Sequence, residues 1–549
     1  MSTTSRRSHR PRLIIATTVA AATVAMGLTA ATGPPAGATG ATTAAAPDTQ
    51  VVAPIPTIDW HPCRFVHRLN CARVPVPLDY DHPNGATIEL QLLMDPANHP
   101  AQRIGTLFVN PGGPGGSAAE FAPYAAHALG KEVAQRFDVV GIDPRGVGSS
   151  TPVRCKGPEN PPPYPRQYFP YTPKQIRIQL RYDRHVTRLC ATGGNPILNH
   201  MSTADTARDM DLIRQVLGED QLNYYGISYG TYLGATYAAM FPDHIRAMIV
   251  DGVLDPVAWS TGRDDAAKTL PFSTRLRSGV GAWEALTSAF AECDRVGKQR
   301  CPLAGDAAGK WLRIVHRLKR GPVRMGHHFR LTYPNWVGDT LGSLYDGSAY
   351  RYLMRYIKAT YNDMFGSRAA RVRSDVASAH RALQRAIDRI RFPGPYGWGD
   401  TQYPSFQGVS CADSINPHNP RAWIAAGKRA DREGPWFGRA WTWASSQCAQ
   451  WPGSKADSFF GPWAVDTSAP VLVIGNAHDP ATPISGARVL NSKLAGSRLL
   501  MMNGWGHGAL GVSTCVTAKE DRYLVDGTLP PPGTVCRPNH ELFPKRKAG

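Results

Sequence analysis

A short segment near the middle of the chain has the pattern of an activated serine nucleophile. Residues 226–230 read Gly-Ile-Ser-Tyr-Gly, a G-x-S-x-G pattern with Ser228 at its centre. Such a serine can attack a carbonyl carbon when it lies on a sharp turn between a strand and a helix, because the turn lifts its hydroxyl clear of the sheet. The apolar run 222–225 precedes the pattern and a helical stretch, 229–241, follows it. The predicted chemistry is acyl transfer through a covalent serine intermediate.

Acyl transfer also needs N–H donors that stabilise the oxyanion of the transition state. Residues 110–117 read Asn-Pro-Gly-Gly-Pro-Gly-Gly-Ser and follow an apolar run, 105–109, that predicts a strand. A phosphate-binding loop is the alternative for such a glycine-rich turn, but no Lys-Ser or Lys-Thr pair follows it. We expect an oxyanion hole made by the N–H of Tyr229 and one N–H from Gly112 or Gly113.

The serine needs a general base, and the base needs an acid that orients it. His507 lies in the sequence Gly-Trp-Gly-His-Gly, directly after the apolar run 497–502. Asp479 lies in Asn-Ala-His-Asp-Pro-Ala-Thr-Pro, which follows the run 471–474 and predicts the acid. Asp251, directly after another apolar run, is the alternative acid. No metal and no organic cofactor is needed for this chemistry, and we expect none.

The apolar runs that carry these residues predict buried parallel strands. They are 105–109, 138–142, 222–225, 247–250, 471–474 and 497–502. Helical patterns such as 203–217 separate them, and strand–helix alternation favours an α/β fold with a mostly parallel, doubly wound sheet. Residues 73–93 predict an antiparallel start to the same sheet.

The alternation stops in the second half of the chain, where about 210 residues are mostly helical and rich in aromatic side chains. Residues 367–391 predict one long basic helix or two. We interpret this segment as a cap inserted before the last strands. The predicted organisation is a signal peptide (1–38), a linker or propeptide (39–57), the first part of the core (58–255), the cap (256–466) and the C-terminal part of the core (467–549).

The N-terminus has the pattern of an export signal. Four arginines and no acid occupy residues 1–12, and a small apolar stretch follows at 13–32. Residues 36–38 read Ala-Gly-Ala, a cleavage pattern, and 44–46 are a second candidate. A membrane anchor is the alternative, but the Ala- and Thr-rich composition and the Gly/Pro/Ala tail favour a cleaved leader. We therefore expect a secreted protein with no stable membrane span.

The cysteines agree with an oxidising compartment. They number ten and fall into five sequential pairs: Cys63 with Cys71, Cys155 with Cys190, Cys293 with Cys301, Cys411 with Cys448, and Cys515 with Cys536. Metal binding is the alternative, but no C-x-x-C or paired Cys/His spacing occurs. We predict five disulfides in these pairs.

Composition excludes several classes of protein. The chain has 549 residues, of which 42% are hydrophobic and 19% charged, so a large core can form and disorder is excluded. The formal net charge is +19. No Lys/Arg run of the nucleic-acid type appears in the body of the chain, so we expect a basic secreted surface and no nucleic-acid partner.

Several motifs together resemble one known family. The chain resembles the secreted tripeptidyl aminopeptidases of actinomycetes, in the proline-iminopeptidase-like branch of the α/β-hydrolases, and the order Ser228, Asp479, His507 is the order of that fold. The matching segments are 71–80, 110–117, 143–153, 203–209, 225–234, 479–483 and 506–507. They span nearly the whole mature chain.

The resemblance implies a serine exopeptidase, expected to be a monomer, that releases short peptides such as tripeptides from free N-termini. Ser228, His507 and Asp479 would form its triad. A free α-ammonium needs a carboxylate partner when it leaves water. Asp413 belongs to a Cys-x-Asp element typical of the family and is the first candidate. Glu120, just after the glycine-rich loop, is the second.

Two other functions stay open. A carboxylesterase would use the same triad but would lack a carboxylate that binds an ammonium group. A binding protein on a catalytically dead hydrolase fold would need no triad at all, and the nucleophile, base, acid and oxyanion loop are all present here.

Overall fold

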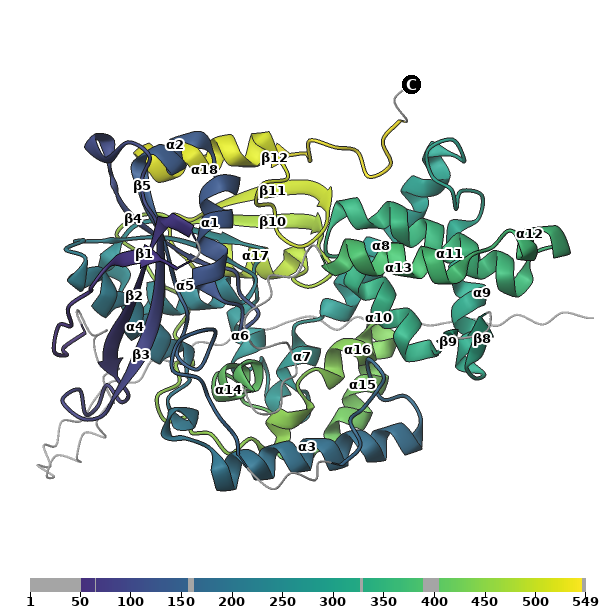
Figure 1. Cartoon of the computed structure of the whole chain (residues 1–549), viewed down its shortest axis with the longest axis horizontal. Coiled ribbons are helices and arrows are strands. Elements are labelled where there is room, and N and C mark those ends of the chain that lie inside the picture. The colour runs from purple at the N-terminus through teal and green to yellow at the C-terminus, as the bar shows by residue number, and fades with distance from the viewer. Residues whose placement is uncertain (1–50, 65, 157–161, 326–328, 389–403, 546–549) are drawn as a thin grey trace, which may run out of the picture. The chain divides into compact units, whose positions relative to one another are not determined.

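One ten-stranded sheet organises the structure, a computed structural model that describes residues 51–64, 66–156, 162–325, 329–388 and 404–545 (Figure 1). Its strands lie in the order β1-β2-β3-β5-β4-β6-β7-β10-β11-β12. Their bounds are His61–Cys63 (β1), Val66–Pro77 (β2), Thr87–Asp95 (β3), Gly105–Asn110 (β4), Phe137–Ile142 (β5), Leu222–Ile227 (β6), Ile245–Asp251 (β7), Leu472–His478 (β10), Arg498–Trp505 (β11) and Val535–Cys536 (β12).

The sheet is mostly parallel, as the sequence predicts. Every neighbouring pair from β5 to β12 is parallel, and the six predicted parallel strands are β4, β5, β6, β7, β10 and β11. The predicted antiparallel start is the β2–β3 pair, in which Val74 lies opposite Leu90. The short strands β1 and β12 were not predicted, because two or three residues give no periodic signal.

Alternate side chains of the central strands enter two different hydrophobic clusters. Leu107 and Tyr225 lie in one cluster, whereas Phe108 and Tyr224 lie in the other. The first cluster is completed by α1 (Ala118–Ala128), α2 (Lys131–Arg136) and α18 (Thr514–Asp526). The second is completed by α3 (Pro173–Gly193), α4 (Thr203–Val216), α5 (Tyr229–Met240) and α17 (Ile484–Asn491). Helices therefore cover both faces of the central sheet, which is why its parallel strands are mostly apolar.

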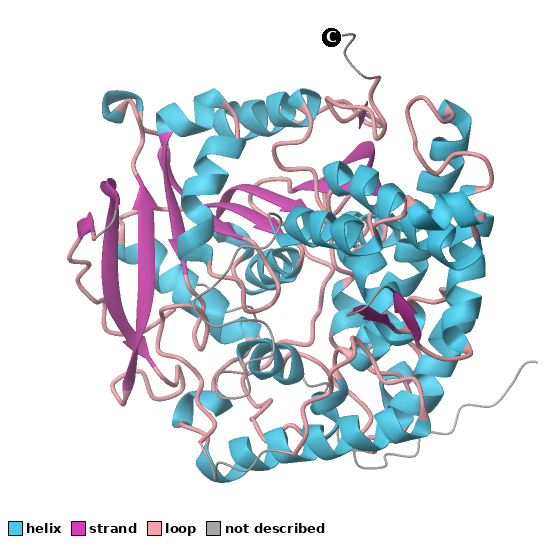
Figure 2. Ribbon diagram, turned by 45° about the vertical axis from the view of Figure 1, so that its right-hand side comes forward, coloured by secondary structure: helices cyan, strands magenta, loops and turns pink. Residues whose placement is uncertain are grey.

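The segment between β7 and β10 is mostly helical, as predicted, and contains one small hairpin, β8 (Val323–Met325) with β9 (Phe329–Leu331) (Figure 2). Its helices are α6 (Pro256–Trp259), α7 (Phe272–Arg275), α8 (Ser278–Val296), α9 (Ala307–Lys319), α10 (Tyr333–Ser343), α11 (Tyr350–Phe365), α12 (Arg368–Val372), α13 (Val376–Asp388), α14 (Ser405–Ala412), α15 (Ala422–Glu433) and α16 (Gly438–Trp443). The predicted basic helix is thus two helices, α12 and α13. The predicted boundaries at 256 and 466 stay predictions.

This segment has its own hydrophobic core. The cluster includes Trp311, Trp336 and Trp423, all fully buried, and it is distinct from the two clusters on the sheet. The described residues also contain six short 3-10 helices, at Pro100–Gln102, Pro196–Asn199, Pro242–His244, Ala266–Lys268, Gly347–Ala349 and Ser446–Gln450.

The structure contains the five predicted disulfides, in the predicted pairs. They close loops of 8 to 37 residues. Each bridge stabilises the fold by about 2–4 kcal/mol, because it restricts the unfolded chain.

The predicted leader and most of the linker lie outside the described residues. Within the described ranges, no helix is both long enough and apolar enough to cross a membrane.

Candidate active site

Ser228 lies on a strained turn between β6 and α5. Its φ of 58° and ψ of −122° fall in a region that side-chain-bearing residues rarely adopt. Glycines on both sides make the turn possible. A Cβ atom at Gly226 would clash with the carbonyl oxygen of Gly230, and a Cβ at Gly230 would lie 2.7 Å from the carbonyl oxygen of Asn110. The G-x-S-x-G pattern is therefore a steric requirement of this turn.

The glycine-rich loop lies directly against this turn. A Cβ atom at Gly112 would lie 2.7 Å from the backbone nitrogen of Tyr229 and 2.9 Å from the Cβ of Ser228. The N–H of Gly112 donates to Oδ1 of Asn110 at 2.8 Å, so it already has a partner. The N–H groups of Gly113 and Tyr229 have no such partner among the described residues. The N–H of Tyr229, which directly follows Ser228, and the N–H of Gly113, in the loop that lies against this turn, are therefore candidate oxyanion donors.

His507 and Asp479 lie in hydrogen-bond contact. Nδ1 of His507 is 3.0 Å from each carboxylate oxygen of Asp479. The N–H groups of Ala481 and Thr482 donate to Oδ1 of Asp479, each at 2.8 Å, and the N–H of Gly508 donates to Oδ2 at 3.2 Å. Three backbone donors thus hold the buried carboxylate in the orientation that pairs with the imidazole.

Thr482 is a further polar residue at this pair, and the sequence analysis did not identify it. Its hydroxyl donates to Oδ2 of Asp479 at 3.0 Å and lies 3.2 Å from Nδ1 of His507. The available signal was a hydroxyl residue three positions after an acid, which is common at turns and therefore weak.

The environment of His507 favours its protonated form. Burial alone would lower the pKa of His507, but the charge of Asp479, its hydrogen bond and the charge of Asp251 raise the pKa above the usual 6.5. A base of this kind can accept the proton of Ser228 and hold it as an imidazolium ion.

Ser228, Asp479 and His507 all follow strands that end at the same edge of the parallel sheet. The turn at His507 packs against the end of β6, since a Cβ at Gly508 would lie 3.4 Å from Cγ2 of Ile227. The helical segment also reaches this turn. The N–H of His507 donates to the carbonyl oxygen of Tyr345 at 2.9 Å, and the two rings pack edge to face.

Comparisons with known proteins agree with this arrangement. A family model described as "TAP-like protein" matches residues 434–536, and one described as "alpha/beta hydrolase fold" matches residues 105–276. A tripeptidyl aminopeptidase of Streptomyces lividans is 30% identical over 500 residues, which cover 88% of this chain and 87% of that protein. The chain belongs to the tripeptidyl aminopeptidase family. It is therefore a serine hydrolase with an α/β-hydrolase fold.

Relatives with other names match this chain at a similar identity. The serine protease Hip1 of Mycobacterium bovis is 31% identical, covering 87% of this chain and 91% of that protein. A protein of Mycobacterium tuberculosis named carboxylesterase B is 32% identical, covering 90% of this chain and 92% of that protein. The family thus includes proteins named as peptidases and as an esterase.

The alternative acid of this hydrolase, Asp251, has other partners. Its Oδ2 accepts the N–H of Ala509 at 2.7 Å, the N–H of Leu510 at 3.2 Å and the hydroxyl of Tyr225 at 3.1 Å. Among the described residues, Asp479 is the acid that pairs with His507. Asp251 instead holds the turn that follows His507.

The two candidates for an ammonium partner differ in access. Asp413 is 1% exposed, and its oxygens accept the N–H of Thr203 at 2.7 Å and the hydroxyl of Thr203 at 2.6 Å. Burial raises the pKa of Asp413 to about 7. Glu120 is exposed in the first turn of α1, next to the glycine-rich loop, and its carboxylate has no hydrogen bond or ion pair within the described part of the chain.

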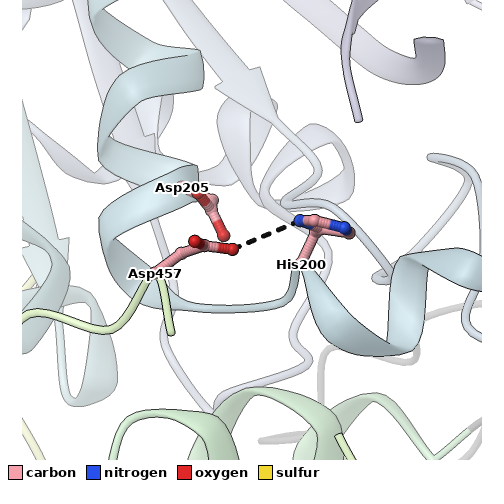
Figure 3. A group of neighbouring side chains, drawn as sticks. All are labelled: His200, Asp205 and Asp457. Carbon is pink, nitrogen blue, oxygen red and sulfur yellow. Dashed lines mark ion pairs between the residues drawn. The ribbon is translucent and has the colours of Figure 1, made fainter. Parts of the chain in front are cut away.

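One group of side chains in the described part of this protein could offer ligands to a metal ion (Figure 3). His200, Asp205 and Asp457 each place one ligand atom within 4.8 Å of the others. Nδ1 of His200 lies 3.2 Å from Asp457, and Asp205 accepts from Arg208 at 3.0 Å and from the hydroxyl of Ser202 at 2.9 Å. Asp205 therefore has partners within the protein, whereas Nδ1 of His200 lies near Asp457 without a hydrogen bond among the described residues.

Proposed function

We propose that this hydrolase is a secreted serine exopeptidase that releases short peptides, such as tripeptides, from the free N-termini of peptides. The contact between His507 and Asp479, at the edge where Ser228 stands on its strained turn, is the observation that carries the proposal. The relatives named tripeptidyl aminopeptidase and serine protease support a peptide substrate.

The residues divide the reaction among them. Ser228 attacks the scissile carbonyl while His507 takes its proton, and Asp479 fixes the tautomer of the imidazole and stabilises the imidazolium. The N–H groups of Tyr229 and Gly113 would stabilise the oxyanion, since neither has a hydrogen-bond partner in the described ranges and the glycine-rich loop lies against Ser228. His507 then protonates the leaving amine, and water hydrolyses the acyl-enzyme by the same route in reverse.

Specificity for a free N-terminus requires an acid that a substrate can reach. Of the two candidates, Glu120 is exposed and has no partner within the described ranges, whereas Asp413 is buried and bonded to Thr203. We therefore assign the ammonium partner to Glu120 first, and to Asp413 only if a substrate displaces Thr203.

Secretion is supported by two independent features. The N-terminal stretch has a basic region, an apolar region and a cleavage pattern, which together are typical of a signal peptide. Five disulfides fit an oxidising compartment outside the cytosol.

A carboxylesterase is the second candidate function. A relative named carboxylesterase B is 32% identical over 90% of the chain, and the same three residues would perform ester hydrolysis. The two functions differ in their need for a carboxylate that binds the ammonium group of the substrate.

Two chromogenic substrates separate these functions: a free tripeptide amide and its N-acetylated twin, tested on protein that lacks residues 1–38. Ser228→Ala is the control. Cleavage of the free peptide alone, absent in the control, supports the exopeptidase. Equal cleavage of the acetylated twin would exclude an ammonium partner, and turnover of short acyl esters alone would favour the esterase.

A further inference from the structure

Two buried carboxyl groups share one tyrosine hydroxyl beneath the turn that carries His507. The hydroxyl oxygen of Tyr225, on β6, lies 3.1 Å from Oδ2 of Asp251 and 3.0 Å from Oε1 of Glu520. Asp251 ends β7, and Glu520 lies on α18, so three elements meet at this point. Both carboxyl groups belong to residues that are 0% exposed.

The hydrogen bonds of this cluster require that one of the two carboxyl groups carries a proton. A tyrosine hydroxyl has one proton, so it can donate to only one of two carboxylates. If both carboxyl groups were ionised, one would face the hydroxyl oxygen with no hydrogen between them, among residues with no solvent-exposed surface. One carboxyl group must therefore be protonated and donate to the oxygen of Tyr225.

The surroundings decide which carboxyl holds this proton. Oδ2 of Asp251 accepts two backbone N–H groups, from Ala509 and Leu510, and such donors stabilise the ionised form. Each carboxyl group has one oxygen without a partner among the described residues, Oδ1 of Asp251 and Oε2 of Glu520. The other oxygen of Glu520, Oε1, contacts only Tyr225, and no cation pairs with Glu520 among the described residues. A buried carboxylate without such partners is strongly disfavoured.

We propose that Glu520 holds a proton at neutral pH and donates it in a hydrogen bond to Tyr225, which keeps Asp251 as the single anion beneath the active-site turn. Glu520 is then a positioning residue for the hydrolase reaction, and this role rests on the proposed function. The chain of donors runs from Glu520 through Tyr225 to Asp251.

Asp251 is the point at which this chain meets the catalytic geometry. Its backbone carbonyl oxygen accepts the N–H of Ser228 at 2.9 Å, and its carboxylate accepts the two N–H groups that follow the turn at His507. The charge of Asp251 also contributes to the raised pKa of His507. Asp251 therefore connects the position of the nucleophile to the position and charge of the base.

The titratable neighbours of the cluster are few. Glu520 faces Tyr225, Asp251 and Asp521, and Asp251 faces Tyr225, Glu520, His507 and Asp479. Glu132 of α2, which packs on α18, faces Asp521. Burial, then the charge of Asp251, raises the pKa of Glu520 to about 8. Burial likewise raises the pKa of Asp251 to about 6, against the effect of its N–H donors.

Stability measured against pH tests the proton directly. The folded protein holds the proton of Glu520 more tightly than the unfolded chain does, where its pKa is the usual 4.5. Raising the pH from about 4.5 to about 8 therefore favours unfolding. Glu520→Gln keeps a donor to Tyr225 but does not titrate. The Tm of this variant minus the Tm of the wild type should therefore increase steadily from about pH 4.5 to about pH 8. Asp526→Asn, at the exposed end of α18, is the matched control and should show no such gain.

A gap in Tm between Glu520→Gln and the wild type that is the same at pH 5 and pH 8 would overturn the proposal. If the Gln variant does not fold, Glu520→Leu replaces it, because any residue that does not titrate must remove the same pH dependence. These measurements need no substrate, so they decide on the proton even if the proposed peptidase activity is absent.

The alkaline limb of activity tests the positioning role. A short acyl ester is the substrate, because the α-amino group of a peptide itself titrates near pH 8. The kcat of the wild type should fall above about pH 8, as a second negative charge forms beside Tyr225, and Glu520→Gln should move this fall to higher pH. Coinciding alkaline limbs would overturn the positioning role, while turnover of the ester but no peptide would count only against the peptidase.

Discussion

The backbone N–H of Ser228 donates to the backbone carbonyl oxygen of Asp251 at 2.9 Å. This bond ties the strained residue after β6 to the last residue of the neighbouring strand β7. The same aspartate holds the turn after His507 through its carboxylate. One residue thus fixes the distance between two parts of the active site that are almost 280 positions apart in the sequence.

The two acids near His507 predict different effects on catalysis. Asp479→Asn should lower kcat by about 10⁴-fold, because the imidazole loses the partner that fixes its tautomer. Asp251→Asn should cost less, since it keeps an oxygen for the N–H groups of Ala509 and Leu510. Steady-state kinetics on one substrate measure both variants. A larger loss for Asp251→Asn would reverse the assignment of the acid.

The hydroxyl of Thr482 should contribute to rate through Asp479. Thr482→Val removes the hydrogen bond to Oδ2 at little change in volume. A net hydrogen bond to a charged group is worth about 1.5–3 kcal/mol, so kcat should fall at least about tenfold while KM changes little. Thr482→Ser, which keeps the hydroxyl, should restore most of the rate. Equal losses in the Val and Ser variants would exclude this role of the hydroxyl.

The pH dependence of activity should show the raised pKa of the general base, His507. His507 must be neutral to accept the proton of Ser228, and its pKa lies above the usual 6.5. The acid limb of kcat/KM should therefore lie above pH 6.5, and Asp479→Asn should move it to lower pH. A pH–rate profile on a short acyl ester measures both. An acid limb at or below 6.5 in the wild type would contradict the electrostatic account.

Gly112 should tolerate no side chain. Its φ of +85° and the short approach to Tyr229 mean that Gly112→Ala pushes the loop away from Ser228. We expect kcat to fall by about 10²–10³-fold, as for loss of an oxyanion donor. Gly527→Ala is the control, because Gly527 has φ +76° and open space around its Cβ position. Similar kinetics for the two variants would show that the close contact at Gly112 is unimportant.

The ammonium partner has its own test. Glu120→Gln should lower kcat/KM for a free tripeptide amide by about 10- to 150-fold. This loss corresponds to the about 1.5–3 kcal/mol that a hydrogen bond to a charged group contributes. Turnover of a short ester should not change. Glu132→Gln, on the exposed surface of the next helix, serves as the control. If Glu120→Gln leaves the free peptide unaffected, Asp413 becomes the remaining candidate.

The sheet could be predicted because its signals are local, and the residues of the proposed triad were placed by the same signals. The strands β4, β5, β6, β7, β10 and β11 are mostly apolar runs, and Ser228, Asp479 and His507 each follow within two residues of the end of such a strand. The cysteine pairs could be predicted for a related reason, since each pair closes a short loop in sequence.

The remaining features depend on contacts between distant parts of the chain. Tyr225 and Glu520 are 295 positions apart, and Glu520 sits among polar residues of α18 that predict an ordinary exposed face. The choice between Asp479 and Asp251 depends on which carboxylate the turn at His507 approaches. The partner of Gly112 depends on a side chain two residues away, Asn110, whose orientation no spacing rule gives.

The most direct test of the proposed function is the mass spectrum of a digested decapeptide with a free N-terminus. The account predicts that the wild type releases a short N-terminal peptide, such as the tripeptide, and leaves the N-acetylated decapeptide intact, while Ser228→Ala cleaves neither. Internal fragments, cleavage of the acetylated decapeptide, or activity that survives in Ser228→Ala would contradict it.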